Sequence, residues 1–188
     1  KIGVLLGFTG PIESLTPDMA SGAELAMKEA SDSGVFMSGS KIISVRGDST
    51  CVDAAAATAT AERLITSDGV SAIMGADCSG VTTAVLQNVA LAKGVVMISP
   101  SATSPALSTI EDNGLFFRTS PSDARQGQVL AEILREKGVK SAAISYTNND
   151  DGKGLADSIQ NNVENLGGKV TITASHEDGK GDYGAEVA

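Results

Sequence analysis

The sequence predicts an α/β fold, with a doubly wound parallel sheet followed by the start of a second, similar lobe. Short apolar runs of strand length alternate with segments whose apolar residues recur at helical spacing. Four strands joined by helical crossovers indicate a parallel sheet with helices on both faces. The same alternation starts afresh after about residue 120. We therefore expect a first lobe at residues 1–120 and an incomplete second lobe at residues 121–188.

Strands and helices of the first lobe follow one another in a regular order. The segment 17–31 has Met19, Ala23 and Met27 at helical spacing, and Asp53 can cap the Ala-rich helix that follows it. The expected strands are residues 1–6, 41–45, 71–75, 95–98 and a short 115–119. The expected helices are residues 17–31, 53–66 and 81–92.

The second lobe begins after a break at residues 120–123, where Asp123 is expected to cap a helix. A helix at 126–137 stops at Gly138, and a polar loop at 147–154 follows the strand 141–146. A helix at 155–166 and a strand at 170–174 complete the pattern. A helical pattern then begins at residue 182 and ceases at 188, which predicts that the chain is a fragment. The expected architecture is thus two Rossmann-like lobes in succession.

Composition and charge exclude several classes of function. The 188 residues are 41% hydrophobic and 20% charged, as in globular proteins. Only 3% are aromatic, without Trp, and the formal net charge is −9, so neither base stacking nor phosphate binding is expected. No apolar run reaches membrane-spanning length. The chain begins at Lys1 without a signal sequence, which predicts a processed or trimmed N-terminus.

The two cysteines, Cys51 and Cys78, follow two of the expected strands. They could form a disulfide, remain as buried thiols, or supply half of a metal site. A metal site is disfavoured because His176 is the only histidine and no CxxC spacing occurs. Neighbouring strand ends favour the disulfide, which would indicate an oxidising compartment.

Hydroxyl-rich loops after two buried strands form the candidate binding site, because open α/β sheets bind ligands there. Ser79 opens a helix, so its hydroxyl and nearby N–H groups favour an anion such as an α-carboxylate; alternatively it only caps that helix. In the loop Ser101-Ala102-Thr103, the Ser101 carbonyl can accept from an ammonium, and the Thr103 hydroxyl and N–H can donate to a carboxylate. The alternative is a plain Ser/Thr turn before Pro105.

An enzyme is not expected. The sequence has no GxSxG, P-loop or GxGxxG motif, and Ser79 has no plausible histidine partner. Asp77 could point at the ligand or be a solvated loop acid, and the second interpretation is favoured; His176 is interpreted as a surface residue. The site is therefore expected to bind without chemistry, and with neither a cofactor nor a metal.

An ordered set of motifs resembles the type I periplasmic binding proteins, specifically the branched-chain amino-acid (Leu/Ile/Val-binding) family of ABC importers. The matching stretches run along nearly the whole chain and are Gly7-Phe-Thr-Gly-Pro11, Gly22-Ala23, Gly47-Asp-Ser-Thr-Cys51, Gly75-Ala-Asp-Cys-Ser79, Ile98-Ser-Pro-Ser-Ala-Thr103, Arg118-Thr-Ser-Pro-Ser-Asp123 with Gln126-Gly127, and Asp151-Gly-Lys-Gly-Leu155. Each stretch is weak alone, and the set in order is specific.

The resemblance implies a two-lobed receptor that captures an amino acid between its lobes and delivers it to a membrane permease. It implies that Ser79, Ser101, Ala102 and Thr103 grip the ligand backbone, and that Asp151 contacts the ligand from the second lobe. Asp151 departs from the family pattern, because many members have an aromatic residue at this position that packs on the ligand. A charged residue there makes a more polar ligand an alternative. Some members carry a disulfide where Cys51 and Cys78 fall.

Further expectations follow from this resemblance. The protein would be periplasmic, or extracellular and membrane-anchored if it is a lipoprotein. A ligand-sensing ectodomain of the same fold, or a truncated fragment that binds nothing, are the alternative functions. Unfinished sheet edges could also pair between copies and form a homo-oligomer.

Overall fold

The structure is a computed structural model that describes residues 1–187, with side chains described for residues 1–185. It divides into two compact units. Unit 1 comprises Lys1–Ala102 and Glu111–Ser120, and unit 2 comprises Thr103–Ile110 and the chain from Pro121 on. The segment Thr103–Ile110 therefore belongs to unit 2, although the sequence analysis placed it in the first lobe. Residue 188, at the end of the expected final helix, lies outside the described residues.

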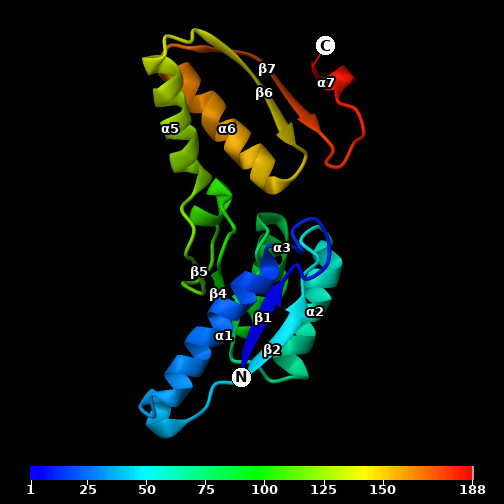
Figure 1. Ribbon diagram of the computed structural model, residues 1–188, viewed down its shortest axis with the longest axis vertical. Coiled ribbons are helices and arrows are strands. Elements are labelled where there is room, and N and C mark those ends of the chain that lie inside the picture. Colours follow the sequence, from blue (N-terminus) through cyan, green and yellow to red (C-terminus); the bar gives the residue numbers. More distant parts are fainter. Residues whose placement is uncertain (188) are drawn as a thin grey trace. The chain divides into compact units, whose positions relative to one another are not determined.

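Unit 1 is built on a five-stranded parallel sheet in the order β2-β1-β3-β4-β5 (Figure 1). Its strands are β1 (Ile2–Leu6), β2 (Ser44–Asp48), β3 (Ala72–Gly75), β4 (Val96–Ser99) and β5 (Phe116–Arg118). Its helical elements are α1 (Thr16–Asp32), η1 (Phe36–Gly39), α2 (Ala54–Thr66), α3 (Ser79–Val85), η2 (Leu86–Ala90) and α4 (Leu91–Lys93). The predicted α/β fold with a parallel sheet is confirmed.

The core of unit 1 lies on both faces of its central strands. On one face, Val4 and Leu6 of β1 pack with Ala20 and Met27 of α1, and all four are buried. On the other face, α2 lies close to β1 and β2 because Gly47 has no side chain; a Cβ there would lie 2.7 Å from Thr60 Cγ2. Alternate residues of β1 thus point to opposite helices, as a doubly wound sheet requires.

A row of apolar side chains across β3, β4 and β5 becomes more exposed to solvent towards the β5 edge of the sheet. Met74, Ile98 and Phe117 are register partners on adjacent strands, so they share one face. Ile98 is 45% exposed and Phe117 is 54% exposed. This edge of unit 1 therefore presents apolar side chains to solvent.

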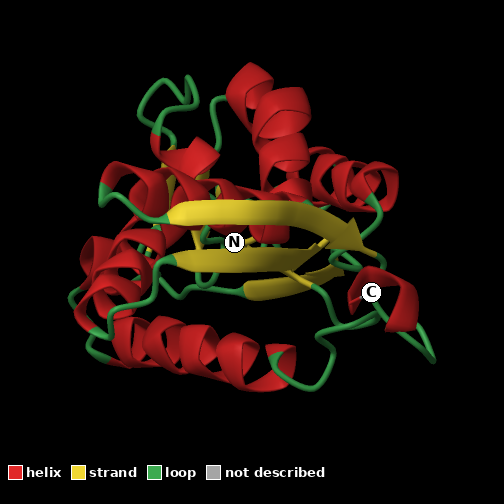
Figure 2. Ribbon diagram, turned by 90° about the horizontal axis from the view of Figure 1, so that it is seen from above, coloured by secondary structure: helices red, strands yellow, loops and turns green. Residues whose placement is uncertain are grey.

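Unit 2 contains a two-stranded parallel sheet packed against one helix, which in turn packs against a second helix. Its elements are η3 (Pro105–Ser108), α5 (Asp123–Glu136), β6 (Ser141–Thr147), α6 (Asp150–Asn165), β7 (Lys169–His176) and α7 (Gly184–Val187). The helices α5 and α6 lie side by side (Figure 1). The short helix α7 follows β7 near the C-terminal end (Figure 2).

Three helices begin two or more residues earlier than the sequence predicted. The expected helix at 81–92 starts at Ser79 and continues through the π-helical turn η2 into α4. In α5 the capping residue is Ser122, whose hydroxyl accepts from Ala124 N, so the prediction that Asp123 caps this helix is wrong. Residues 150–154, expected in a loop, form the first turn of α6 because the Asn149 side chain accepts from Gly152 N.

Candidate functional site

The two hydroxyl-rich loops lie at the carboxyl edge of the unit 1 sheet. They follow β3 and β4, which are adjacent and parallel, so both loops leave the same edge. Ser79 and Ala102 are fully buried, whereas Ser101 is half-buried. Of the residues predicted to bind ligand, these three belong to unit 1.

Hydrogen bonds join the two loops directly. The Ser99 hydroxyl donates to the Ala76 carbonyl at 2.5 Å and accepts from the Ala102 N–H at 3.0 Å. The Ser101 hydroxyl donates to the Asp77 carbonyl at 3.0 Å. The loop backbone is therefore held by its own side chains, and the Ser101 hydroxyl is already engaged as a donor.

The end of β5 also holds this loop. The Ala102 carbonyl accepts from Arg118 Nη1 at 3.1 Å and from the Ser120 hydroxyl at 3.2 Å. Ser99, Arg118 and Ser120 were not among the residues predicted from the sequence to form the site. All three lie in stretches that carry the family resemblance, but only the pairing of β4 with β5 brings Arg118 next to Ala102.

Ser79 is the first residue of α3, and the residue before it, Cys78, occupies the N-cap position. The Cys78 carbonyl accepts from both the N–H and the hydroxyl of Thr82. Ser79 therefore does not act as the helix cap considered in the sequence analysis. Its hydroxyl is inaccessible to solvent in this structure, and its role in ligand binding stays a prediction.

Asp77 is buried, with 2% of its surface exposed, so its interpretation as a solvated loop acid is wrong. Its carboxylate accepts hydrogen bonds from Gly7 N, the Ser49 hydroxyl and Cys78 N. These donors satisfy the buried charge, which would otherwise be costly. The sequence pattern contains no signal of this, because Gly7 and Ser49 are 70 and 28 residues away.

Cys51 and Cys78 form a disulfide, with their Cα atoms 5.2 Å apart. The bond links the loop after β2 to the loop after β3. The prediction of a disulfide is confirmed, and the alternatives of free thiols and of a metal site fall away. Among the described residues, no cluster of His, Cys, Asp or Glu could hold a metal ion.

Asp48, at the end of β2, accepts from the Thr9 hydroxyl at 2.6 Å and from Thr50 N at 2.9 Å. Burial alone would raise the pKa of this carboxyl. The hydrogen bonds from Thr9 and Thr50 outweigh that effect and hold the pKa of Asp48 below its ordinary value of 3.8. Asp48 is therefore an ionised acceptor that orders the loop after β1.

Thr103 and Asp151 belong to unit 2, where they contact each other. The Thr103 hydroxyl donates to Asp151 Oδ1 at 3.3 Å, and the Thr103 carbonyl accepts from Asp123 N at 2.9 Å. Thr103 also borders a hollow of about 330 Å³ whose apolar lining includes Val129 and Leu130 of α5. Both predicted residues are half-buried and thus accessible.

His176 contacts other residues of unit 2. Its Nδ1 lies 2.9 Å from the Ser145 hydroxyl, its Nε2 lies 3.5 Å from the Thr147 hydroxyl, and its ring packs edge-on against Tyr183. Both ring nitrogens thus face hydroxyl groups. None of these contacts is the carboxylate that orients the histidine of a catalytic triad.

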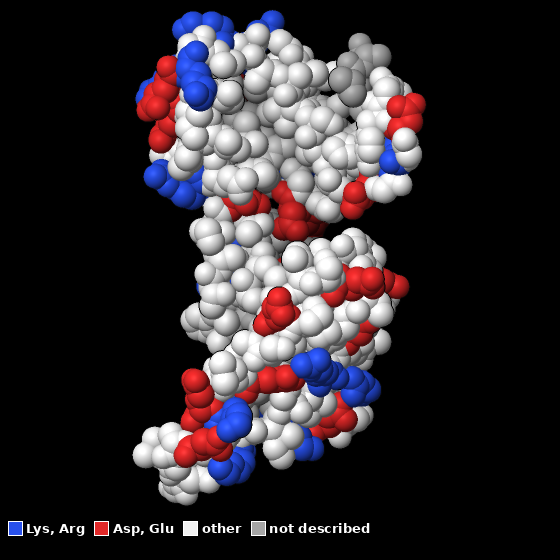
Figure 3. All heavy atoms as spheres, viewed as in Figure 1, with Lys and Arg blue, Asp and Glu red and all other residues white. Residues whose placement is uncertain are grey.

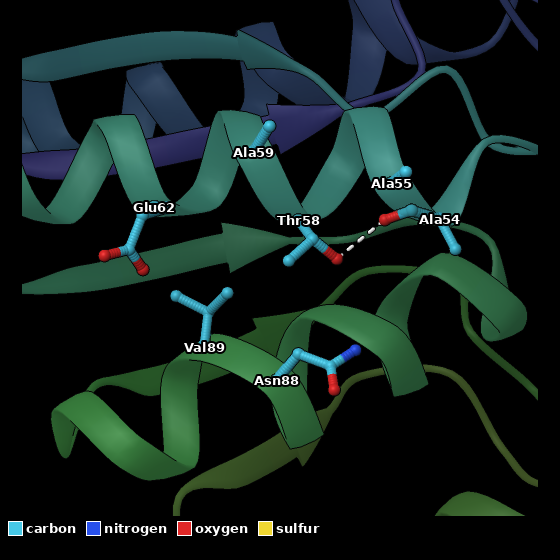
Figure 4. Close-up of a pocket in the computed structure, with 7 residues that line it drawn as sticks. All are labelled: Ala54, Ala55, Thr58, Ala59, Glu62, Asn88 and Val89. Carbon is cyan, nitrogen blue, oxygen red and sulfur yellow. Dashed lines mark hydrogen bonds between the residues drawn. The ribbon is translucent and has the colours of Figure 1, made fainter.

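A surface groove of about 530 Å³ lies away from these loops, between α2 and the helix that contains η2 (Figure 4). Small side chains of α2 line one wall, and Asn88 and Val89 line the other. Glu62 at its end pairs with Lys93. Glu62 is the only charged residue that lines this groove, among the described residues. On the face shown in Figure 3, basic and acidic side chains intermix and do not form a basic patch.

The fold and the loop cluster are typical of a class of proteins: α/β proteins that bind small ligands at the carboxyl edge of a parallel sheet. The chain belongs to the periplasmic binding protein family, whose model matches residues 1–188. No helix of the described residues has the length and apolar character to cross a membrane.

Curated relatives and a solved structure agree with this assignment. The chain is 30% identical over 189 residues to a Leu/Ile/Val-binding protein of Citrobacter freundii and 30% identical over 189 residues to a leucine-, isoleucine-, valine-, threonine- and alanine-binding protein of Pseudomonas aeruginosa. These matches cover all of this chain but 50% and 49% of the relatives. The chain therefore spans about half the length of the curated relatives it matches.

The solved structure is that of a branched-chain amino acid transporter substrate-binding protein from Streptococcus pneumoniae in complex with isoleucine. It matches 99% of this chain with a TM-score of 0.83 and 28% identity, over 52% of its own length. The recognition of this family from sequence motifs is thereby confirmed.

Proposed function

We propose that this chain is the ligand-capturing part of an extracytoplasmic substrate-binding protein. It takes an amino acid of the branched-chain type, or a similar one, and delivers it to the membrane permease of an ABC importer. In this proposal the first lobe is residues 1–120 and the second is residues 121–188. The segment Thr103–Ile110 packs with unit 2, so we assign it to the second lobe.

One observation carries this proposal: the loops after β3 and β4 are tied together at the carboxyl edge of the parallel sheet. That edge is where open α/β sheets bind small ligands. A loop fixed by its own hydroxyls presents its remaining backbone groups in one arrangement, which lowers the entropic cost of binding. Family membership supports the same conclusion.

The contacts divide the proposed ligand-binding residues into two groups. Ser101, Thr103 and Asp151 are accessible, and we assign them to the charged groups of the ligand. The Ser101 carbonyl and the Asp151 carboxylate are assigned to the ammonium. The Thr103 hydroxyl is assigned to the carboxylate, to which it turns from Asp151 when the ligand binds. Ser79 and Ala102 are buried and are proposed to act through the backbone of their loops.

The disulfide supports an extracytoplasmic location, since such bonds persist mainly in oxidising compartments. The relatives' names supply the ligand class: one binds leucine, isoleucine, valine, threonine and alanine, and another was solved with isoleucine. The polar Thr103–Asp151 contact makes threonine worth testing beside the aliphatic amino acids.

The test is an NMR titration of the chain with L-leucine, L-isoleucine, L-valine and L-threonine up to millimolar concentration. We expect saturable shifts of the backbone amides of Ser101, Ala102 and Thr103 with at least one L-amino acid, and none with D-leucine. If no L-amino acid moves these amides, amino-acid capture by this chain is wrong.

Replacing Thr103 by Ala tests its assigned contact. We expect binding to weaken by about 1–3 kcal/mol, because a hydrogen bond to the ligand carboxylate is lost. Thr103→Ser keeps the hydroxyl and should bind nearly as the wild type does. Thr109→Ala, at an exposed position of the same segment, serves as the matched control. Equal affinities for Thr103→Ala and Thr109→Ala would remove Thr103 from the site.

A further inference from the structure

The carboxylate of Asp77 joins three loops of unit 1 at one point. Its Oδ2 accepts from Gly7 N at 2.5 Å, in the loop after β1. Its Oδ1 accepts from the Ser49 hydroxyl at 3.0 Å, after β2, and from Cys78 N at 2.9 Å, after β3. A single side chain therefore connects the exits of three adjacent strands.

The surroundings of this carboxylate leave no room for another arrangement. Asp77 is 2% exposed and Ser49 is fully buried. A Cβ on Gly7 would lie 3.2 Å from Asp77 Oδ2 and 3.3 Å from Cys51 Cβ, so Gly7 is enclosed between the carboxylate and the disulfide. Gly7 and Ser49 are buried and Cys78 is half-buried, so the Gly7 and Ser49 donors in particular depend on Asp77 as their acceptor.

The backbone of the same residue reaches the fourth loop. The Asp77 carbonyl accepts from the Ser101 hydroxyl at 3.0 Å, and the carbonyl of the preceding residue, Ala76, accepts from Ser99. A displacement of Asp77 would thus move the loop that contains Ser101, which we assign to the ligand ammonium.

We propose that Asp77 is the positioning residue of the amino-acid site. Its side-chain oxygens fix the loops after β1, β2 and β3, and its carbonyl transmits that position to the Ser101 loop. It does not contact the ligand. This inference rests on the proposed function, because the affected affinity is that for an amino acid.

The informative substitution is Asp77→Asn, which keeps the shape of the side chain but has one acceptor oxygen in place of two. Its NH₂ group must face either Gly7 N or Cys78 N, so one of these two donors loses its acceptor. By amide exchange measured with NMR, we expect at least a tenfold faster exchange at Gly7 or Cys78, and also at Ala102, than in wild type. L-leucine should bind at least fivefold more weakly.

Two further variants separate positioning from general stability. Leu64→Ala removes a fully buried side chain of α2 that lies away from these loops, so it should lower the denaturation midpoint without selective exchange in the loops or loss of affinity. Ser49→Ala removes only one of the three donors, so it should give a smaller increase in loop exchange and a smaller loss of L-leucine affinity. It replaces Asp77→Asn as the test variant if Asp77→Asn does not fold.

Several results would overturn the proposal. One is that the loop amides of Asp77→Asn exchange at the wild-type rate. Another is that amide exchange rates rise uniformly across unit 1, as we expect for Leu64→Ala. The third is that the loop amides exchange faster while the affinity for L-leucine is unchanged. If the wild-type chain binds no amino acid, the proposed function fails, and with it the role of Asp77 in binding. Exchange rates would still report separately whether Asp77 holds the loops.

Discussion

At the scale of single residues, hydrogen-bond donors decide how the aspartates at the carboxyl edge of the unit 1 sheet behave. Asp48 and Asp77 both receive N–H and O–H donors from neighbouring loops. In Asp48 these donors stabilise the ionised carboxylate, and at both residues they order the loops that supply them. Loop geometry at this edge consequently depends on carboxylate acceptors.

Asp48 makes this dependence testable by pH. Its pKa is lowered in the folded chain, so its ionised form stabilises the fold above the unfolded-state pKa of about 3.9. That contribution is lost as the pH falls through the lowered pKa. In urea unfolding from about pH 5 to about pH 2, we expect the wild type to lose stability more steeply than Asp48→Asn. Parallel curves for the two proteins would contradict this assignment.

The sequence could predict which loops carry the site, but not how each side chain is used. Ser101 and Ser79 were found because hydroxyls follow apolar strand-length runs. Asp77 was misjudged because its burial depends on Gly7 and Ser49, which the fold alone brings to it. Arg118 was missed for the same reason, since its contact with the Ala102 carbonyl requires β5 to lie beside β4.

At the scale of elements, glycine determines how closely the helices of unit 2 approach. Gly127 of α5 faces α6, and a Cβ there would lie 2.7 Å from Ser158 Cβ and 2.8 Å from the Ser158 carbonyl carbon. Contacts this short with backbone cannot be relieved by a rotamer change. The α5–α6 pair therefore requires glycine at this position.

We expect Gly127→Ala to destabilise unit 2 by about 1–3 kcal/mol, because overpacking outweighs the gain in helix propensity. Gly22→Ala is the matched control: Gly22 lies in α1, and a Cβ there meets no atom within 4 Å. That substitution should stabilise the chain by up to about 1 kcal/mol. Denaturant midpoints of the two variants measure the contrast, and shifts in the same direction would refute it.

Element types followed from the periodicity of apolar residues, whereas the helix starts did not. Residues 150–154 contain two glycines and three charged residues, a composition typical of a loop. The Asn149 side chain nevertheless caps Gly152 N, and this local bond starts α6 one turn early. The π-helical turn at Leu86–Ala90 has no comparable signal in the sequence.

At the scale of the whole molecule, apolar burial differs between the two units. The buried apolar side chains of unit 2, among the described residues, are Leu107, Ala131, Ala156 and Val163. Unit 1 buries larger residues on its central strands, including Leu5, Leu6, Ile73 and Met97. Because burial of apolar surface is the main stabilising term, unit 2 has the smaller reserve of stability.

We therefore expect the amides of α5, α6, β6 and β7 to exchange through openings of lower free energy than those of β1, β3 and β4. Native-state hydrogen exchange by NMR at increasing urea measures both sets in one sample. Val163→Ala should lower the opening free energy of the unit 2 amides by about 1–3 kcal/mol, because it leaves a cavity beneath α6. The same opening free energy for both sets of wild-type amides would show instead that the chain unfolds as one cooperative body, and that the smaller core of unit 2 does not limit its stability.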